Sequence, residues 1–219
     1  MLNCGLGILL IPACGVLLLI KGAQYIPVLE AVFAEMPGAI TVVLCTALFL
    51  LNSMNDMAAP SVSLEGKSIW IPQSLPVKAK TVLRAKTAMH LILTGIPMLF
   101  TTVCAWKIVP GSVTEKLLFV LLVLCNTVFS ALFGSCLGVK MANLHWTNEI
   151  APIKQSGAVT FALLGGWVVA GVFAAVFFLI GYKLGALTYL GLWTAAFFAA
   201  DIILKLWLDT KGARRFSEL

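Results

Sequence analysis

Long apolar runs alternate with short polar intervals along most of the chain, which is the pattern of helices that cross a membrane. About 20 apolar residues span the hydrocarbon core of a bilayer. Six runs meet or approach this length: residues 2–20, 38–53, 88–106, 117–139, 159–180 and 187–208. Backbone groups in lipid must be hydrogen-bonded within their own segment, so runs of this length are expected to be helices. The pattern predicts an all-α, polytopic bundle of about six transmembrane helices, forming a single domain over residues 1–219.

The composition supports the membrane class and excludes an ordinary soluble domain. Hydrophobic residues make up 61% of the chain, charged residues 11%, and the mean hydropathy is +1.03. Soluble domains average about 25% charged residues. The net charge of +6 predicts contact with anionic lipids, and nothing separate points to nucleic acid. All six cysteines fall within predicted spans without a metal-binding spacing, so we interpret them as apolar packing residues and expect no cofactor.

The basic residues predict the orientation, because Lys and Arg are retained on the cytoplasmic side of a membrane. With the N-terminus in the cytoplasm, eleven of the fifteen basic residues are cytoplasmic and four are outside: Lys21, Lys107, Lys116 and Lys183. The longer connections, 54–87 and 140–158, are then cytoplasmic, as is the C-terminus. We expect the surface that contacts other molecules to lie on this side.

Small and polar residues recur at helical spacing in the fourth and fifth spans. They are Asn126, Ser130, Gly134 and Gly138 in the fourth span and Gly166 in the fifth. Such residues let helix backbones approach closely within a membrane. We expect this packing to be within the subunit, with dimerisation as the alternative.

Asp201 is the one carboxylate deep in a predicted span, where a charge is costly and often functional. Lys205 follows one turn later, so we expect an ion pair, with the lysine extending toward the cytoplasmic surface. His90 lies at comparable depth and is the alternative partner for Asp201. A proton relay is the functional alternative to this structural pair.

Catalytic chemistry has little support in the chain. Two histidines and one intramembrane carboxylate provide neither a nucleophile with its base nor a metal-binding set. Gly66-Lys67-Ser68 looks like the end of a phosphate-binding loop, but Ser61 stands where that motif requires glycine. We therefore expect a protein that is not an enzyme, and any ATP to be bound by another chain.

Three polar segments carry a resemblance to a known family: Ser63-Leu-Glu-Gly-Lys-Ser-Ile-Trp-Ile-Pro-Gln-Ser-Leu-Pro-Val-Lys78, Leu144-His-Trp-Thr-Asn-Glu149 and Lys211-Gly-Ala-Arg-Arg-Phe-Ser-Glu-Leu219. They resemble the cytoplasmic loops and tail of permease subunits of bacterial ABC exporters, and the likeness runs over about Met36 to Leu219. The resemblance implies a multi-pass protein of the bacterial inner membrane, matching the C-terminal part of a larger permease. It also implies a separate ATP-binding ABC subunit, with a second permease half or a second copy as a further partner.

Within this resemblance, residues 63–86 correspond to the segment that docks on the ATPase subunit. We expect Gly66 to permit a tight turn, Glu65 and Lys67 to make charge-directed contacts, and Leu75 with Pro76 to anchor the next helix. The alternative for each of these residues is an interfacial loop that rests on lipid head groups. Trp146, Asn148 and Glu149 mark the second cytoplasmic loop. The alternatives are a secondary transporter coupled to ions or protons and, third, an integral membrane enzyme that acts on lipid.

Overall fold

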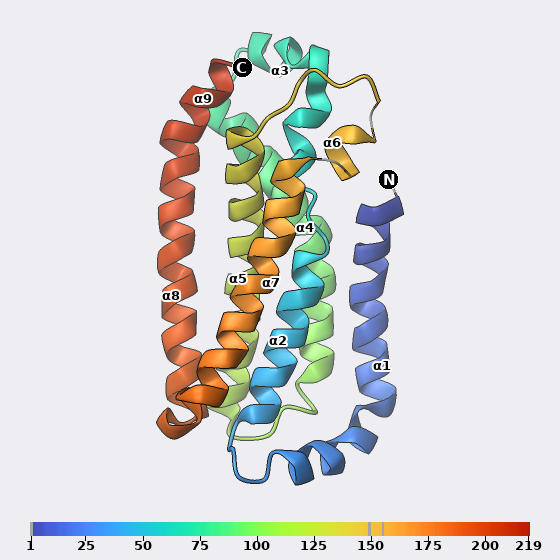
Figure 1. Cartoon of the computed structure of the whole chain (residues 1–219), viewed down its shortest axis with the longest axis vertical. Coiled ribbons are helices and arrows are strands. Elements are labelled where there is room, and N and C mark those ends of the chain that lie inside the picture. Colours follow the sequence, from blue (N-terminus) through green and yellow to red (C-terminus); the bar gives the residue numbers. More distant parts are fainter. Residues whose placement is uncertain (1, 149, 155) are drawn as a thin grey trace.

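The computed structural model describes residues 2–148, 150–154 and 156–219 as a bundle of helices (Figure 1). Helices make up 82% of the chain, and the described residues form no β-strand. The long helices are α1 (Leu2–Val32), α2 (Ala39–Ser53), α4 (Ala79–Ala105), α5 (Val113–Lys140), α7 (Gly157–Leu179) and α8 (Ala186–Trp207). The all-α helical bundle predicted from the apolar runs is confirmed.

Four of these helices, α4, α5, α7 and α8, are long and apolar enough to cross a membrane. In α1 the parts Gly7–Gly22 and Gln24–Val32 meet at 85°, and counting this bent pair as one span gives five. The remaining apolar helix, α2, has 15 residues. It is shorter than the roughly 20 residues that a full crossing takes. The six apolar runs therefore form six helices, of which four or five qualify as spans by length and composition.

Helix α5 lies at the centre of the bundle, in contact with α8, α4, α7 and α2. Its residues Phe119, Leu122 and Val123 are fully buried. Aromatic side chains from the surrounding helices fill the space beside it. The rings of Phe49, Phe173, Trp193 and Phe197 form a row in which the centroids of successive rings are 5.1–5.9 Å apart. This apolar core holds the long helices together and leaves the polar segments at the ends of the bundle.

Helix α1 attaches to the edge of the bundle through α4. The Thr101 hydroxyl donates a hydrogen bond to the Ile11 carbonyl oxygen, 2.8 Å away. Gly15 lies so close to the same residue that a Cβ on it would be 3.0 Å from the Thr101 Cα. The absence of a side chain at Gly15 thus permits a close approach between the two helices.

The shorter elements gather mainly at one end of the bundle (Figure 1). They are η1 (Ala59–Ser61), η2 (Ser63–Ser68), α3 (Trp70–Ser74), α6 (Ala151–Lys154), the π-helical turn η4 (Leu208–Gly212) and α9 (Ala213–Ser217). The start of α1 and the C-terminus are at this end too, and η3 (Gly181–Leu184) is at the other. The two long connections and the C-terminus therefore share one end. That this end is cytoplasmic stays a prediction.

Candidate functional site

Three segments form a polar structure at this end of the bundle, which we call the cap: residues 54–78, 141–148 and 208–217. The first begins where α2 ends at Ser53, and irregular backbone around Asp56 separates α2 from η1. The Asp56 Oδ1 accepts hydrogen bonds from the backbone N–H groups of Ala58 and Ala59, each 3.0 Å long. Burial raises the pKa of this carboxyl to about 6, against the lowering effect of the two hydrogen bonds. Through these two hydrogen bonds Asp56 fixes the start of η1.

Gly66 interrupts η2 with a non-helical backbone conformation, and the second loop closes over it. Its φ of 49° and ψ of −128° are accessible to glycine but disfavoured for other residues. A Cβ on Gly66 would stand 2.8 Å from the Trp146 ring. The Trp146 Nε1 donates to the Ser63 carbonyl oxygen at 2.6 Å, and the Ser63 hydroxyl accepts from the Asn143 N–H at 3.0 Å. The two loops are therefore one packed unit.

An ion pair fastens the same turn to helix α4. The Lys86 Nζ lies 2.6 Å from the Glu65 Oε1 and also donates to the Ser61 carbonyl oxygen at 2.9 Å. The two charged side chains are only 18% and 20% exposed. Because both are largely withdrawn from solvent, removing one partner would leave the other charge poorly solvated, which makes the pair costly to break from one side. Glu65 is thus an internal anchor, which differs from its expected contact with a partner protein.

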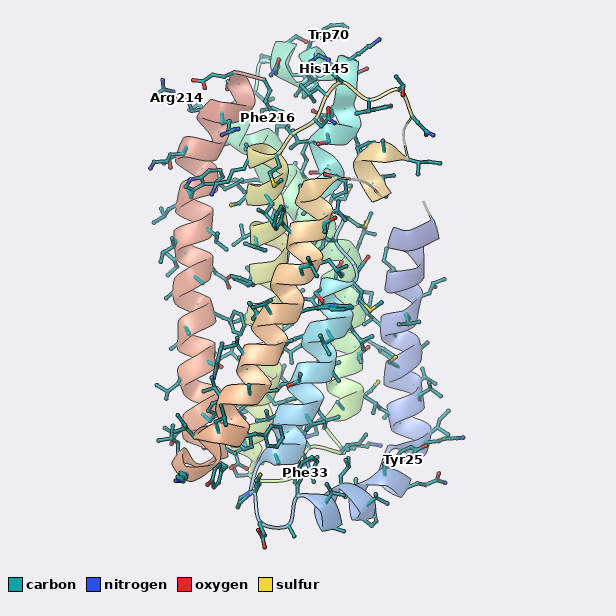
Figure 2. All side chains as sticks on the ribbon, in the orientation of Figure 1. Tyr25, Phe33, Trp70, His145, Arg214 and Phe216 are labelled. Atoms are coloured by element: carbon teal, nitrogen blue, oxygen red, sulfur yellow. The ribbon has the colours of Figure 1, made fainter. Side chains whose placement is uncertain are left out.

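Helix α3 carries exposed apolar side chains at the outermost point of the cap, where Figure 2 shows Trp70. We call this surface the α3 patch and define it as Trp70, Ile71, Leu75 and Val77. These side chains are 48–63% exposed. Lys67, Pro76 and Lys78 are also exposed and adjoin the patch in the chain. Large apolar groups that gather on a surface beside polar residues can mark a site of contact with another protein or with the membrane.

The C-terminal segment supports α3 from beneath. The Gln73 Nε2 donates to the carbonyl oxygen of Phe216 at 2.9 Å, and the Phe216 ring is 1% exposed. Arg84 of α4 holds Asp209 through two bonds of 2.6 and 2.7 Å. The α3 patch is thus connected to α4 directly along the chain and to α8 through η4 and α9.

A layer of buried polar residues lies beneath the cap and ties α2, α4 and α5 together. The Asn52 side chain donates to the Asn126 Oδ1 at 3.0 Å, and the Asn55 side chain donates to the Thr94 hydroxyl at 2.8 Å. Asn52, Asn126 and Ser130 also line a cavity of about 10 Å³, which is about the size of one water molecule. Asn52, Asn55 and Asp56 were not predicted as site residues from the sequence. The signal was the polar run Asn52-Ser-Met-Asn-Asp56 directly after an apolar run.

The small-residue stripe packs within the subunit. A Cβ on Gly134 would lie 2.7 Å from the Asp56 Oδ1, and one on Gly138 would lie 2.5 Å from the Ala59 carbonyl oxygen. Gly166 of α7 lies against the Cβ of Ser53 on α2. Each of these glycines therefore accommodates α2 or the segment that follows it. The structure supports the expectation of internal packing over the dimer alternative.

The expected ion pair between Asp201 and Lys205 is not formed. Asp201 is 9% exposed and its Oδ1 has no hydrogen-bond partner among the described residues, whereas Lys205 is exposed. Four residues advance a helix by slightly more than one full turn, and here Lys205 extends outward instead of back toward the carboxylate. His90 does not replace it as the partner, because its Nδ1 accepts from the Met57 N–H at 3.2 Å and its Nε2 has no hydrogen-bond partner among the described residues. The predicted pairing of Asp201 with Lys205 was therefore wrong, and so was the alternative pairing with His90.

The remaining expected residues lie in the cap with different roles. The Asn148 Oδ1 accepts from the Ile150 N–H at 3.0 Å and turns the chain toward α6. Leu75 is extended and exposed, and with Pro76 it leads from α3 into α4. Glu149 lies outside the described residues. In the part of the chain that the structure describes, no three His, Cys, Asp or Glu side chains are grouped as metal ligands.

Comparison with protein-family models, with curated proteins and with solved structures gave no match.

Proposed function

We propose that the chain is a membrane-spanning permease subunit of an ATP-driven exporter, and that a separate ATP-binding subunit docks on the α3 patch. The exposure of Trp70 and Ile71 on a short helix at the end of a membrane bundle carries this proposal. The chain has no complete phosphate-binding loop of its own. The resemblance of Ser63–Lys78 to ABC permeases supports the same assignment.

In this proposal the cap transmits force from the partner to the helices. A displacement of α3 reaches α4 through residues 75–78 and reaches α8 through the Gln73 bond to Phe216. The turn at Gly66 moves with it, because Trp146 and Lys86 join that turn to the second loop and to α4. Closure of two ATP-binding subunits would thereby reorient several helices together.

The experiment separates docking from coupling by using two kinds of variant. Trp70→Asp removes the apolar anchor of the α3 patch while leaving every described hydrogen bond of the cap in place. Gly66→Ala leaves the patch exposed but forces a Cβ into the Trp146 ring. We expect Trp70→Asp to abolish co-purification of an ATP-hydrolysing subunit from native membranes. We expect Gly66→Ala to retain that subunit and to lower ATP-dependent transport in reconstituted vesicles.

Val113→Asp is the matched control, because Val113 is 66% exposed at the other end of the bundle. It should retain both the partner and transport. Proteins that copurify equally with wild type, Trp70→Asp and Val113→Asp would show that the α3 patch does not bind an ATPase. Mass spectrometry then identifies the retained subunit, whose sequence should contain a complete nucleotide-binding motif. A retained subunit without such a motif would contradict the proposal.

A secondary transporter coupled to ions or protons is the second candidate, and one observation favours it. Asp56 is a buried carboxylate where α2 gives way to irregular backbone, and broken helices with buried polar groups are typical ion sites of such transporters. Transport driven by an ion gradient without ATP, and lost in Asp56→Asn, would support this candidate. ATP-dependent transport that survives in Asp56→Asn would support the exporter.

A further inference from the structure

A groove runs between α1 and α2 on the side of the bundle. It exists because α1 packs mainly against α4, with Gly15 and Ile11 facing that helix. The groove has a volume of about 480 Å³, within the range of ligand sites in proteins. Its walls are mainly apolar and come from Cys14, Leu17, Leu18, Gly22, Leu44, Ala47, Leu48 and Leu51.

Two polar groups, Lys21 and Tyr25, stand at the end of the groove away from the cap. Figure 2 shows Tyr25 at that end, where α1 turns by 85°. If the part Gly7–Gly22 crosses the bilayer, the bend lies near the membrane surface, which would place Lys21 close to the lipid head groups. Among the described residues Lys21 has no carboxylate partner. Glu30, in the part of α1 that follows the bend, lines a separate cavity.

We propose that this groove binds one anionic phospholipid, with an acyl chain along Leu17 and Leu48 and the phosphate at the Lys21 ammonium and the Tyr25 hydroxyl. The occupant is a bilayer lipid because the groove is open to the lipid-facing side, where Leu17 is 57% exposed. Its head group is anionic because the one charged group in the lining is a cation. This site does not depend on the proposed exporter function.

The experiment places a photo-crosslinking residue, benzoylphenylalanine, at Leu17 in vesicles of equal phosphatidylglycerol and phosphatidylcholine. A second protein carries it at Val168, which is 63% exposed on α7 and lines no described cavity. Mass spectrometry then identifies the lipid attached at each position. A lysine near an anionic lipid contributes about 1 kcal/mol. We therefore expect the glycerol-to-choline ratio of adducts at Leu17 to exceed that at Val168 by about fivefold.

Lys21→Gln should return the ratio at Leu17 to the value at Val168, whereas Lys183→Gln, at the same end of the bundle, should leave it raised. Crosslinks at Val168 in each variant verify that the protein is folded and inserted. Equal ratios at Leu17 and Val168 in the wild-type background would refute the site, since bulk lipid would then fill the groove without selection. Crosslinks from Leu17 mainly to a second protein chain, or more choline than glycerol adducts at Leu17, would also overturn it.

Discussion

Gly138 of α5 is the described glycine whose added Cβ would come nearest to a main-chain atom, and it gives the sharpest stability prediction, the substitution Gly138→Ala. An added Cβ would lie 2.5 Å from the Ala59 carbonyl oxygen and 3.3 Å from that of Ala58. Both neighbours are main-chain atoms and cannot rotate away. Carbon and carbonyl oxygen normally approach no closer than about 3.3 Å, so the segment after α2 must move by almost 1 Å. Asp56 resists this shift because it is hydrogen-bonded to both Ala58 and Ala59.

The magnitude follows from comparison with Gly171→Ala. Gly171 lies on α7 with no heavy atom of another described part of the chain within 4 Å of its Cβ position. Both substitutions gain about 1 kcal/mol of helix propensity. Only Gly138→Ala suffers the steric cost, which is about 1–3 kcal/mol for overpacking. The difference between the two variants therefore isolates the steric term.

Unfolding in a mixed detergent with increasing SDS measures this difference as a change in the free energy of unfolding. We expect Gly171→Ala to be at least as stable as wild type and Gly138→Ala to be about 1–3 kcal/mol less stable than Gly171→Ala. Far-ultraviolet circular dichroism verifies that both start from the same helix content. Equal stability of the two variants would refute the tight contact between α5 and the segment after α2.

Three further predictions concern the cap. Cysteines at Lys67 and Lys183 should react from opposite sides of the membrane, with Lys67 protected in intact cells, and external labelling of Lys67 would reverse the predicted orientation. The folded pKa of about 6 for Asp56 exceeds its ordinary value of 3.8. Protonation of Asp56 therefore stabilises the fold: its contribution to the free energy of unfolding is fully present below about pH 4 and is lost as the pH rises through about 6. Asp56→Asn should flatten this slope of up to about 3 kcal/mol in unfolding measured from pH 4 to 7. Trp146→Phe removes the bond to Ser63 and should cost about 1 kcal/mol, with faster proteolysis of the cap as the readout, and unchanged proteolysis would contradict the joined loops.

The residues of the candidate site were only partly predictable from the sequence. The interval Ser63–Lys86 stood out because a long polar segment between apolar runs has to lie outside the hydrocarbon. The contacts of the individual residues within this interval were not evident from the sequence. Glu65 binds Lys86 and Gly66 lies under Trp146, while Trp70 and Ile71 are the exposed apolar groups. Those contacts join residues about 20 to 80 positions apart, which no local pattern specifies.

The sequence by itself determined that the chain forms apolar helices, because backbone groups in lipid must be bonded within each helix. It also placed the glycines that let the helices approach closely. Only the tertiary structure decided which partner each small residue faces, that α1 bends and leaves a groove beside α2, and that Asp201 and Lys205 remain apart. The reason is that a long apolar run is enough to predict a helix, whereas the neighbours of that helix and the direction of each polar side chain depend on how all the helices pack together.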